Sequence, residues 1–221
     1  MDPSNTTLDL ILLAVIAVIG WRLWKVLGTQ TGIDHGATPT SQPEPLTPAP
    51  PQIESLPPIW QDHAKEGSEL AKALIDMAKI DPALNPSNFL EGAKIVHAKV
   101  LEAFAATKLN EVEQLLGHDV LQTLRAEIST RLKKGEILHY KLVGYDSVRI
   151  LSAKLRGNVA ALTTRFETRL ISWTSDAVGV VTVGNASKTE SHVDLWTFEK
   201  DLTSSDPSWL LVETGEAKEE G

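Results

Sequence analysis

The chain has 221 residues, no cysteine, and a formal net charge of −8 at pH 7. Without cysteine it forms no disulfide and holds no thiolate-bound metal, a composition that favours a reducing compartment. The negative charge argues against nonspecific binding to nucleic acid, which has the same sign. The charge is unevenly distributed, because residues 86–156 carry about eleven basic and about eight acidic side chains while both flanking regions are acidic.

An apolar segment near the N-terminus predicts a single membrane-spanning helix within residues 1–27. Residues 10–21 carry no charged side chain, and a helix extended to residue 27 has the roughly 20 residues that a hydrocarbon core requires. Tryptophan and basic side chains at the end of this segment suit the membrane interface. These predicted anchor residues are Trp21, Arg22, Trp24 and Lys25.

The charges around the apolar segment argue against a cleaved signal peptide and indicate an orientation. Asp2 and Asp9 precede the segment and the basic residues follow it, which is the reverse of the order in a signal peptide. By the positive-inside rule, the basic flank faces the cytoplasm. We therefore expect the N-terminus outside the membrane and the C-terminal domain in the cytoplasm.

Residues 28–58 predict a disordered linker, because they hold eight of the chain's twelve prolines and lack apolar periodicity. Residues 59–85 follow as a segment with an amphipathic helix. Its apolar positions run from Trp60 to Ile80 and are interrupted by Gly67. This helix packs on the following domain or docks a partner, and the sequence leaves both alternatives open.

A folded domain over residues 86–215 begins with helices. Asn85 before Pro86 is a helix start, since a capping residue precedes proline at the first helical position. A short helix, Glu111–Leu116, separates this helix from another over residues 118–134. The apolar stripe of the first helix contains Phe89, Ala93, Val96, Val100 and Phe104, and that of the last contains Val120, Leu121, Leu124, Ile128 and Leu132.

After Gly135 the apolar period changes from helical to two, which indicates strands. The sequence Arg156-Gly157-Asn158 is a hairpin signal. The predicted strands cover residues 138–150, 159–173, 178–183, 191–199 and 209–213. Helices followed by an antiparallel meander predict an α+β fold, with the helices packed on one face of a curved sheet. Residues 216–221 form an acidic tail.

Several segments of the chain resemble the Tim44-like domain family, which is named for the mitochondrial subunit that tethers Hsp70 to the protein-import channel. The segments that carry the resemblance are Arg22–Gly28, Phe89–Val96, Ile128–Gly135, Asp194–Asp201 and Ser205–Trp209. Among these, the last two (DLWTFEKD and SDPSW) are the most specific. The resemblance covers over half of the chain and nearly all of its predicted folded part.

The resemblance implies a cystatin-like or nuclear-transport-factor-like α+β domain. It also implies an alphaproteobacterial protein of the inner membrane that acts as an adaptor for an Hsp70 chaperone. The N-terminus would then be periplasmic and the C-terminal domain cytoplasmic. Chaperone binding follows from the resemblance of the domain as a whole, because the mitochondrial protein's long Hsp70-binding region has no recognisable counterpart here.

No sequence motif points to an enzyme. The chain lacks zinc-protease, nucleophile-elbow and phosphate-loop patterns, and its six histidines are scattered. We expect these histidines on the surface and predict no catalytic residue, metal or cofactor. Asp194 and Tyr140 are the residues that could face an apolar pocket of this fold, with a hydrogen bond from the protein backbone to Asp194 as the simpler interpretation.

Two groups of residues are candidate binding sites. The first would line a pocket or partner surface, although large aromatic residues at such spacings usually form the core. It contains Phe104, Phe166, Asp194, Trp196 and Phe198. The second is a basic patch that suits anionic lipid headgroups or acidic partners, or is an ordinary solvated face. It contains Arg125, Arg131, Lys133, Lys134 and Lys141.

Together these features predict a non-catalytic adaptor that is anchored in the lipid bilayer and links Hsp70, or a translocating client protein, to the membrane. One alternative is a structural assembly subunit of a secretion-type membrane complex. Such subunits keep this domain outside the cytoplasm, so topology separates the two hypotheses. The other alternative is a protein that binds a lipid or another small molecule in the pocket.

Overall fold

The structure is a computed structural model that describes residues 58–216. The predicted membrane anchor, with Trp21, Arg22, Trp24 and Lys25, lies outside the described residues. The same holds for the predicted linker up to residue 57 and for the acidic tail from residue 217 on. Within the described residues, no helix is both long and apolar enough to span a membrane.

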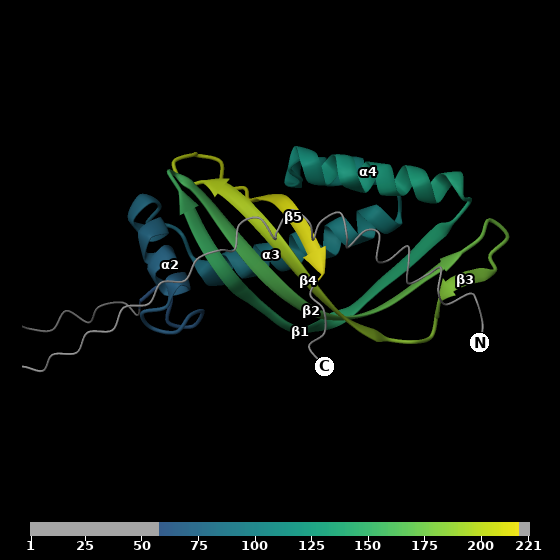
Figure 1. The fold of residues 1–221 in the computed structure, drawn as a ribbon, viewed down its shortest axis with the longest axis horizontal. Helices are drawn as coiled ribbons and strands as arrows, with labels where there is room; N and C mark the ends of the chain where they lie inside the picture. The colour runs from purple at the N-terminus through teal and green to yellow at the C-terminus, as the bar shows by residue number, and fades with distance from the viewer. Residues whose placement is uncertain (1–57, 217–221) are drawn as a thin grey trace, which may run out of the picture. The chain divides into compact units, whose positions relative to one another are not determined.

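The described part of the chain is an α+β fold, as the sequence predicted (Figure 1). The helical elements come first and the strands follow. The helices are α2 (Glu69–Ile80), α3 (Pro86–Ala105), η1 (Leu109–Glu111), η2 (Glu113–Leu115) and α4 (His118–Lys133). The strands are β1 (Ile137–Arg156), β2 (Val159–Ser175), β3 (Val181–Gly184), β4 (Glu190–Asp201) and β5 (Leu210–Glu216).

The N-termini of α2 and α3 are capped by side chains that the sequence supplies. The Asn85 side chain accepts a hydrogen bond from the backbone N–H of Asn88 at 3.1 Å, which satisfies one of the free donors at the start of α3. The prediction of one helix from residue 60 was wrong over its first part. Gly67 has a φ of +72°, and Ser68 caps α2, so the helix begins only at Glu69.

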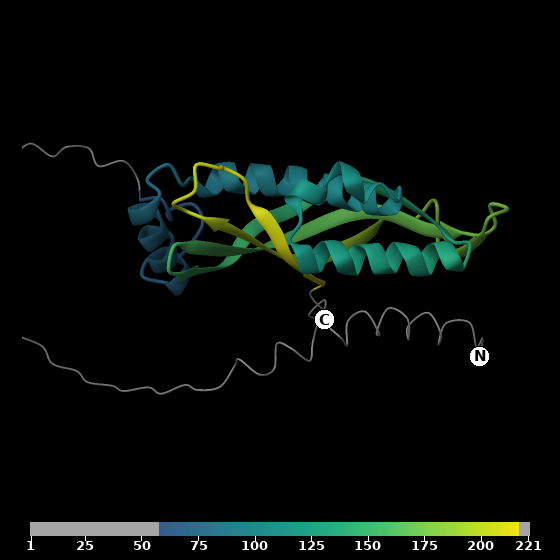
Figure 2. The same ribbon diagram turned by 90° about the horizontal axis from the view of Figure 1, so that it is seen from above.

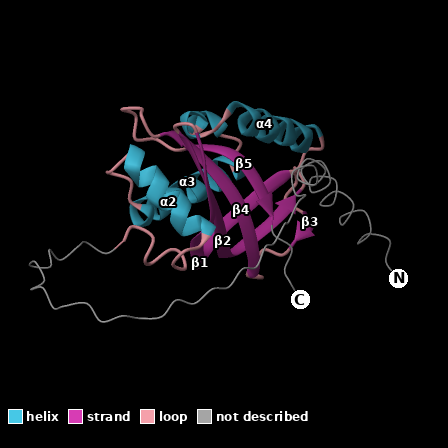
Figure 3. Ribbon diagram, turned by 60° about the vertical axis from the view of Figure 1, so that its left-hand side comes forward, coloured by secondary structure: helices cyan, strands magenta, loops and turns pink. Residues whose placement is uncertain are grey.

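A curved antiparallel sheet with the order β1-β2-β4-β5 forms the second layer (Figure 3). Long strands β1 and β2 pair along their whole length, and β1 has irregularities near Leu142, Tyr145 and Ile150 that bend it. The short strand β3 pairs with the end of β2 beyond the point where β4 begins. The meander was therefore predicted correctly, except that β3 is a side branch of it.

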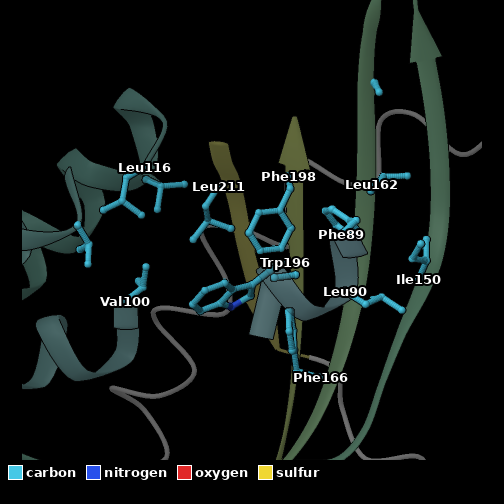
Figure 4. Close-up of a cluster of buried hydrophobic side chains, with 14 of the residues drawn as sticks. Phe89, Leu90, Val100, Leu116, Ile150, Leu162, Phe166, Trp196, Phe198 and Leu211 are labelled. Carbon is cyan, nitrogen blue, oxygen red and sulfur yellow. The ribbon is translucent and has the colours of Figure 1, made fainter. Parts of the chain in front are cut away.

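The core lies between α3, α4 and one face of the sheet, and α2 contributes the fully buried Leu74 and Met77 to it (Figure 4). Alternate residues of β2 point to this face and are buried, and Phe166 and Leu162 are fully inaccessible. Phe89 of α3 packs its ring against Phe198 of β4, with centroids 5.7 Å apart. The apolar stripes of the helices therefore face the sheet, as their spacing indicated. Leu132 is the exception, because it lies at the end of α4 and is 60% exposed.

Candidate functional site

A histidine of α3 is one of the fully buried polar residues of the interior. His97 has no solvent-exposed surface. Its imidazole ring stacks on Phe166 of β2, with centroids 4.3 Å apart and an interplanar angle of 20°. The ring of Trp196 from β4 lies 4.5 Å away. The structure therefore places His97 inside the core, and our expectation that the histidines lie on the surface was wrong for this residue.

Both ring nitrogens of His97 have polar partners. Nε2 lies 3.0 Å from Oδ2 of Asp194 on β4, and Nδ1 lies 3.1 Å from the hydroxyl of Tyr145 on β1. The Tyr145 hydroxyl also donates to the backbone carbonyl of Lys94, at 3.0 Å. These contacts connect one helix to two strands. We name His97, Asp194 and Tyr145 the buried triad.

With Asp194 as the hydrogen-bond acceptor, the proton inventory of the buried triad has two solutions. A hydroxyl has only one proton. When Tyr145 donates to Lys94, the hydroxyl oxygen accepts from Nδ1–H of His97, and both ring nitrogens carry a proton. When His97 carries a proton only on Nε2, Tyr145 turns its hydroxyl to Nδ1. In both solutions Nε2–H donates to Asp194, so this carboxylate always has a partner inside the core.

Tyr145 of the buried triad and the nearby Tyr140 are held in the protonated form. Burial, together with the nearby Asp194 carboxylate, raises the pKa of Tyr145 to about 12. Burial raises the pKa of Tyr140 still further, with smaller contributions from Tyr145 and Asp194. The Tyr140 hydroxyl is buried and has no hydrogen-bond partner. At neutral pH both side chains are therefore neutral phenols, which suit hydrogen bonding better than proton abstraction.

Asp194 thus takes a partner that the sequence did not indicate. We expected a hydrogen bond from the backbone, whereas the structure pairs Asp194 with His97. His97 was predictable in part, because it lies on the same face of α3 as Ala93 and Val100, four residues before and three residues after it. Within residues 58–216, no group of three or more histidine and acidic side chains is placed to hold a metal ion.

The predicted aromatic pocket residues have different environments. Phe166, Trp196 and Phe198 are all buried in the core. Phe104 lies at the end of α3, half-buried, with the guanidinium carbon of Arg131 located 4.9 Å from its ring centroid. Of the aromatic residues predicted for this site, Phe198 alone also reaches the open groove described next.

An open groove of about 430 Å³ runs between α3 and the β4–β5 hairpin. Its walls are mostly apolar. They are formed by Leu84, Phe89, Ala93, Val96, Leu115, Phe198 and Trp209. We call this space the α3 groove. Trp209 is half-buried and packs on Phe89, with ring centroids 4.8 Å apart. It was part of the SDPSW segment, but the sequence did not indicate that it lines a groove.

The polar end of the α3 groove contains an ion pair. Lys200 Nζ lies 3.1 Å from Asp81 Oδ2, and both side chains are largely buried. Asn85, Asn88 and Ser208 complete this end. The charges of Lys200 and Asp81 cancel, and the other three side chains are uncharged, so the residues that line the groove have no net charge. The groove therefore suits an apolar side chain flanked by neutral polar groups.

The predicted basic residues have different contacts. Arg131 donates to the backbone carbonyls of Phe104 and Ala105 at the end of α3, at 2.7 and 3.3 Å, and burial lowers its pKa. Arg125 pairs with Glu113. Lys141 is exposed on β1, where its Cα lies opposite that of Ile171 on β2. Lys133 and Lys134 are exposed at the end of α4.

A model of the Tim44-like domain matches residues 70–216 of this chain. The chain therefore belongs to the Tim44-like domain family. The match begins inside α2 and ends with β5, so it includes α3, the buried triad and the α3 groove. No match was found among curated proteins.

Among solved structures, the chain is similar to the intermembrane space region of the chloroplast protein ARC6. The two sequences are 12% identical, and the TM-score is 0.41. The similarity covers 57% of this chain and 95% of the ARC6 chain.

Proposed function

We propose that this protein is a membrane-anchored adaptor that binds a protein partner through the α3 groove. The observation that carries this proposal is an open groove of about 430 Å³ with apolar walls and a half-buried tryptophan. Partner surfaces concentrate binding energy in apolar pockets that accept a large side chain, and tryptophan is enriched in such sites. Membership of the Tim44-like domain family supports a role in protein interaction.

The partner we propose is an Hsp70 chaperone or an apolar segment of a client protein at the inner membrane. The resemblance noted in the sequence supports the chaperone, and the neutral, apolar groove supports a client segment. The apolar stretch within residues 1–27 supports anchoring in the bilayer, and the proline-rich segment supports a tether. The order of charges supports a cytoplasmic domain, with the N-terminus in the periplasm.

We propose binding without catalysis. The most chemically versatile residue of the interior, His97, has no exposed surface, and both of its nitrogens have protein partners. A general base needs access to the proton that it removes. The neutral state of Tyr140 and Tyr145 supports the same proposal, because neither phenol is prepared to accept a proton.

Two other functions are compatible with an apolar groove. One is a structural subunit of a secretion-type membrane complex, which would hold this domain on the periplasmic side. The other is a carrier of a lipid or small molecule in the α3 groove. The experiment below separates both from the adaptor, because it identifies the partner and the side of the membrane on which it lies.

The test is a crosslinked pull-down of the intact protein from solubilised inner membrane, with and without ATP, analysed by mass spectrometry. It is repeated with Gly92→Leu. Gly92 lines the groove, and an added Cβ at this position meets no atom within 4 Å, so α3 has room for a side chain there that would narrow the groove. Lys99→Leu is the matched control, because Lys99 is exposed on the same helix outside the groove.

The adaptor predicts recovery of Hsp70 that depends on ATP, or recovery of client proteins. Gly92→Leu should reduce this recovery about tenfold, which corresponds to about 1.4 kcal/mol of binding free energy. Lys99→Leu should leave it unchanged. Equal recovery with both variants would contradict the groove as the binding site. Recovery of periplasmic or channel components alone would support the secretion-type alternative, and a co-purified lipid without a protein would support the carrier.

A further inference from the structure

The end of the domain that contains β3 concentrates exposed apolar side chains. Of the twelve large hydrophobic residues that are exposed within residues 58–216, six lie at this end. The strand register brings them together, because Ile137 of β1 and Val181 of β3 both lie opposite Ser175 of β2. Figures 1 and 2 both show β3 and the C-terminal end of α4 at the end of the domain opposite α2. We name this end the valine tip, and its exposed apolar residues are Leu132, Ile137, Val178, Val180, Val181 and Val183.

The turn between β2 and β3 exposes its apolar side chains while its polar backbone groups are paired. Val178 is 84% exposed and Val180 is 60% exposed. The backbone N–H groups of these two valines both donate to the carboxylate of Asp176, at 3.0 and 2.8 Å. The backbone N–H of Asp176 donates in turn to the carbonyl of Val180, at 2.9 Å. The turn therefore presents valine side chains on a backbone that satisfies its own hydrogen bonds.

This combination is what a lipid bilayer requires of an inserted turn. In the apolar part of a bilayer, backbone polar groups must find their partners within the protein, whereas an added protein strand needs free backbone groups to pair with. The hydroxyl of Thr182 also donates inward, to the carbonyl of Thr174 at 3.3 Å. From residue 177 to residue 187 the sequence has no charged side chain, and charged side chains are costly inside a bilayer. The valine tip therefore fits a lipid surface better than a strand partner.

Two exposed lysines accompany the apolar residues at the same end. Lys133 and Lys134 close α4 immediately after Leu132 of the valine tip. Lysines near a membrane surface attract anionic headgroups, and their long side chains reach from an apolar layer to the phosphates. The acidic side chains nearby are engaged within the domain, because Asp176 accepts from the backbone of its own turn and Glu136 interacts with Arg131. The lysines are therefore available to anionic headgroups.

An aromatic pair lies beside these residues. The ring of Trp173 on β2 stacks on that of His139 on β1, with centroids 4.6 Å apart and an interplanar angle of 7°. Trp173 lies opposite Gly184 at the end of β3. Because tryptophan is enriched at the level of the headgroups, its place behind the exposed valines matches the order of layers in a membrane interface.

We propose that the valine tip inserts into the interfacial layer of the membrane, with Val178 and Val180 in the apolar layer and Lys133 and Lys134 at the phosphates. This inference rests on the membrane anchor proposed above. The predicted linker before residue 58 has about thirty residues, which would extend to about 90 Å. The seventeen residues of β2 extend over about 56 Å. The linker is therefore long enough for the valine tip to reach the membrane that holds the anchor, and the domain is then held to it at both ends.

Site-specific fluorescence of the full chain in vesicles tests the insertion, because the sequence has no cysteine and a single one can be labelled. Val178→Cys receives a polarity-sensitive label, and the vesicles contain phosphatidylcholine and phosphatidylglycerol. We expect a blue-shifted emission that a doxyl-labelled lipid quenches and that iodide in the water does not. The matched control is Leu151→Cys, because Leu151 is a 49% exposed residue of β1 outside the valine tip. Its label should be quenched by iodide and not by the lipid.

Further substitutions in the labelled Val178→Cys chain separate the apolar contribution from the electrostatic one. Val180→Asp places a charge in the apolar layer and should reduce the ratio of inserted to free tip at least about tenfold in all vesicles. Lys133→Gln combined with Lys134→Gln should reduce this ratio about tenfold in vesicles with phosphatidylglycerol, and hardly at all in phosphatidylcholine alone. All three side chains are exposed, so the core is untouched, and circular dichroism checks the fold of each variant.

The inference is overturned if the labels at positions 178 and 151 are quenched alike, or if the aspartate and glutamine variants behave like the parent. It is also overturned if the label at position 178 is shielded from iodide but not quenched by the lipid in native membranes, because a protein then covers the valine tip. Flotation of the vesicles reports the anchor separately. A chain that floats with an unquenched label keeps the anchor and loses the tip contact, whereas a chain that does not float contradicts both proposals.

Discussion

The imidazole Nε2 of His97 lies 3.0 Å from Oδ2 of Asp194, and this contact joins α3 to β4 across 97 residues of sequence. The pair lies among aromatic rings, where an unpaired polar group is costly. Through Tyr145, the same histidine also contacts β1. The buried triad therefore holds the helix in one position on the sheet. The position of α3 in turn sets one wall of the α3 groove.

The first prediction concerns the loss of the carboxylate. Asp194→Ala leaves Nε2 of His97 buried without its partner, so we expect the free energy of unfolding to fall by about 1–3 kcal/mol. Asp146→Ala is the control, because Asp146 pairs with Arg169 on an exposed part of the sheet and such pairs contribute about 1 kcal/mol or less. Guanidinium denaturation followed by circular dichroism measures both. Equal losses would show that the triad contributes no more than a surface pair.

The second prediction concerns the aromatic core. Trp196 is 3% exposed and contacts His97, Phe166 and Phe198. Trp196→Ala should reduce the free energy of unfolding by about 3–5 kcal/mol, because it removes a large buried ring and leaves a cavity. The control is Val178→Ala, which changes an exposed side chain and should leave the free energy of unfolding almost unchanged. A small loss for Trp196→Ala would mean that the ring docks a partner instead of filling the core.

Local signals in the sequence predicted most elements of the fold. Asn85-Pro86 marked the start of α3, and the hairpin at Gly157 joined β1 to β2 as expected. These signals act over a few residues, through caps and turns. The Tim44-like family was also recognisable, because its most specific segments lie on β4 and in the turn that follows. The class of fold and the family therefore followed from short-range patterns.

The candidate site was less predictable, because it depends on contacts between distant elements. Spacing alone places His97 toward the core, but it does not say that Asp194 and Tyr145 meet it there. The position of Tyr145 depends on the irregularities of β1, which shift the register of side chains. The α3 groove likewise forms where Gly92 and Trp209, far apart in the sequence, face the same space.

The third prediction compares two glycines. Gly92 lies within α3 and has open space around an added Cβ, so Gly92→Ala should raise the free energy of unfolding by about 0.5–1 kcal/mol through helix propensity. Gly184→Ala should lower it by about 1–2 kcal/mol or more, because its positive φ and the nearby Ser172 oxygen both oppose a side chain. Thermal unfolding of both variants gives the two signs. If both variants raised, or both lowered, the free energy of unfolding, the backbone conformation described for one of the two glycines would be wrong.

The fourth prediction concerns the two tyrosines, which are the only ones in the chain. Alkaline titration followed by the ultraviolet absorbance of tyrosinate therefore reports Tyr140 and Tyr145 alone. Unfolded chains titrate near the ordinary pKa of 10.0, whereas the folded protein should show Tyr145 near 12 and Tyr140 above it. The pKa of both phenols is raised on folding. Each thus binds its proton more tightly in the folded state than in the unfolded state.

The sign of the effect on stability follows from this difference. Below pH 10 both the folded and the unfolded state keep the phenol protons. In this range the titration of the phenols therefore does not reduce the free energy of unfolding. Between pH 10 and about 12 the unfolded chain loses the Tyr145 proton while the folded protein keeps it, so the free energy of unfolding falls as the pH rises. Tyr145→Phe should make this fall shallower, and it should leave a single tyrosine that titrates above the ordinary range. If tyrosinate appears near pH 10 in the folded protein, the phenols are not held in the interior as described.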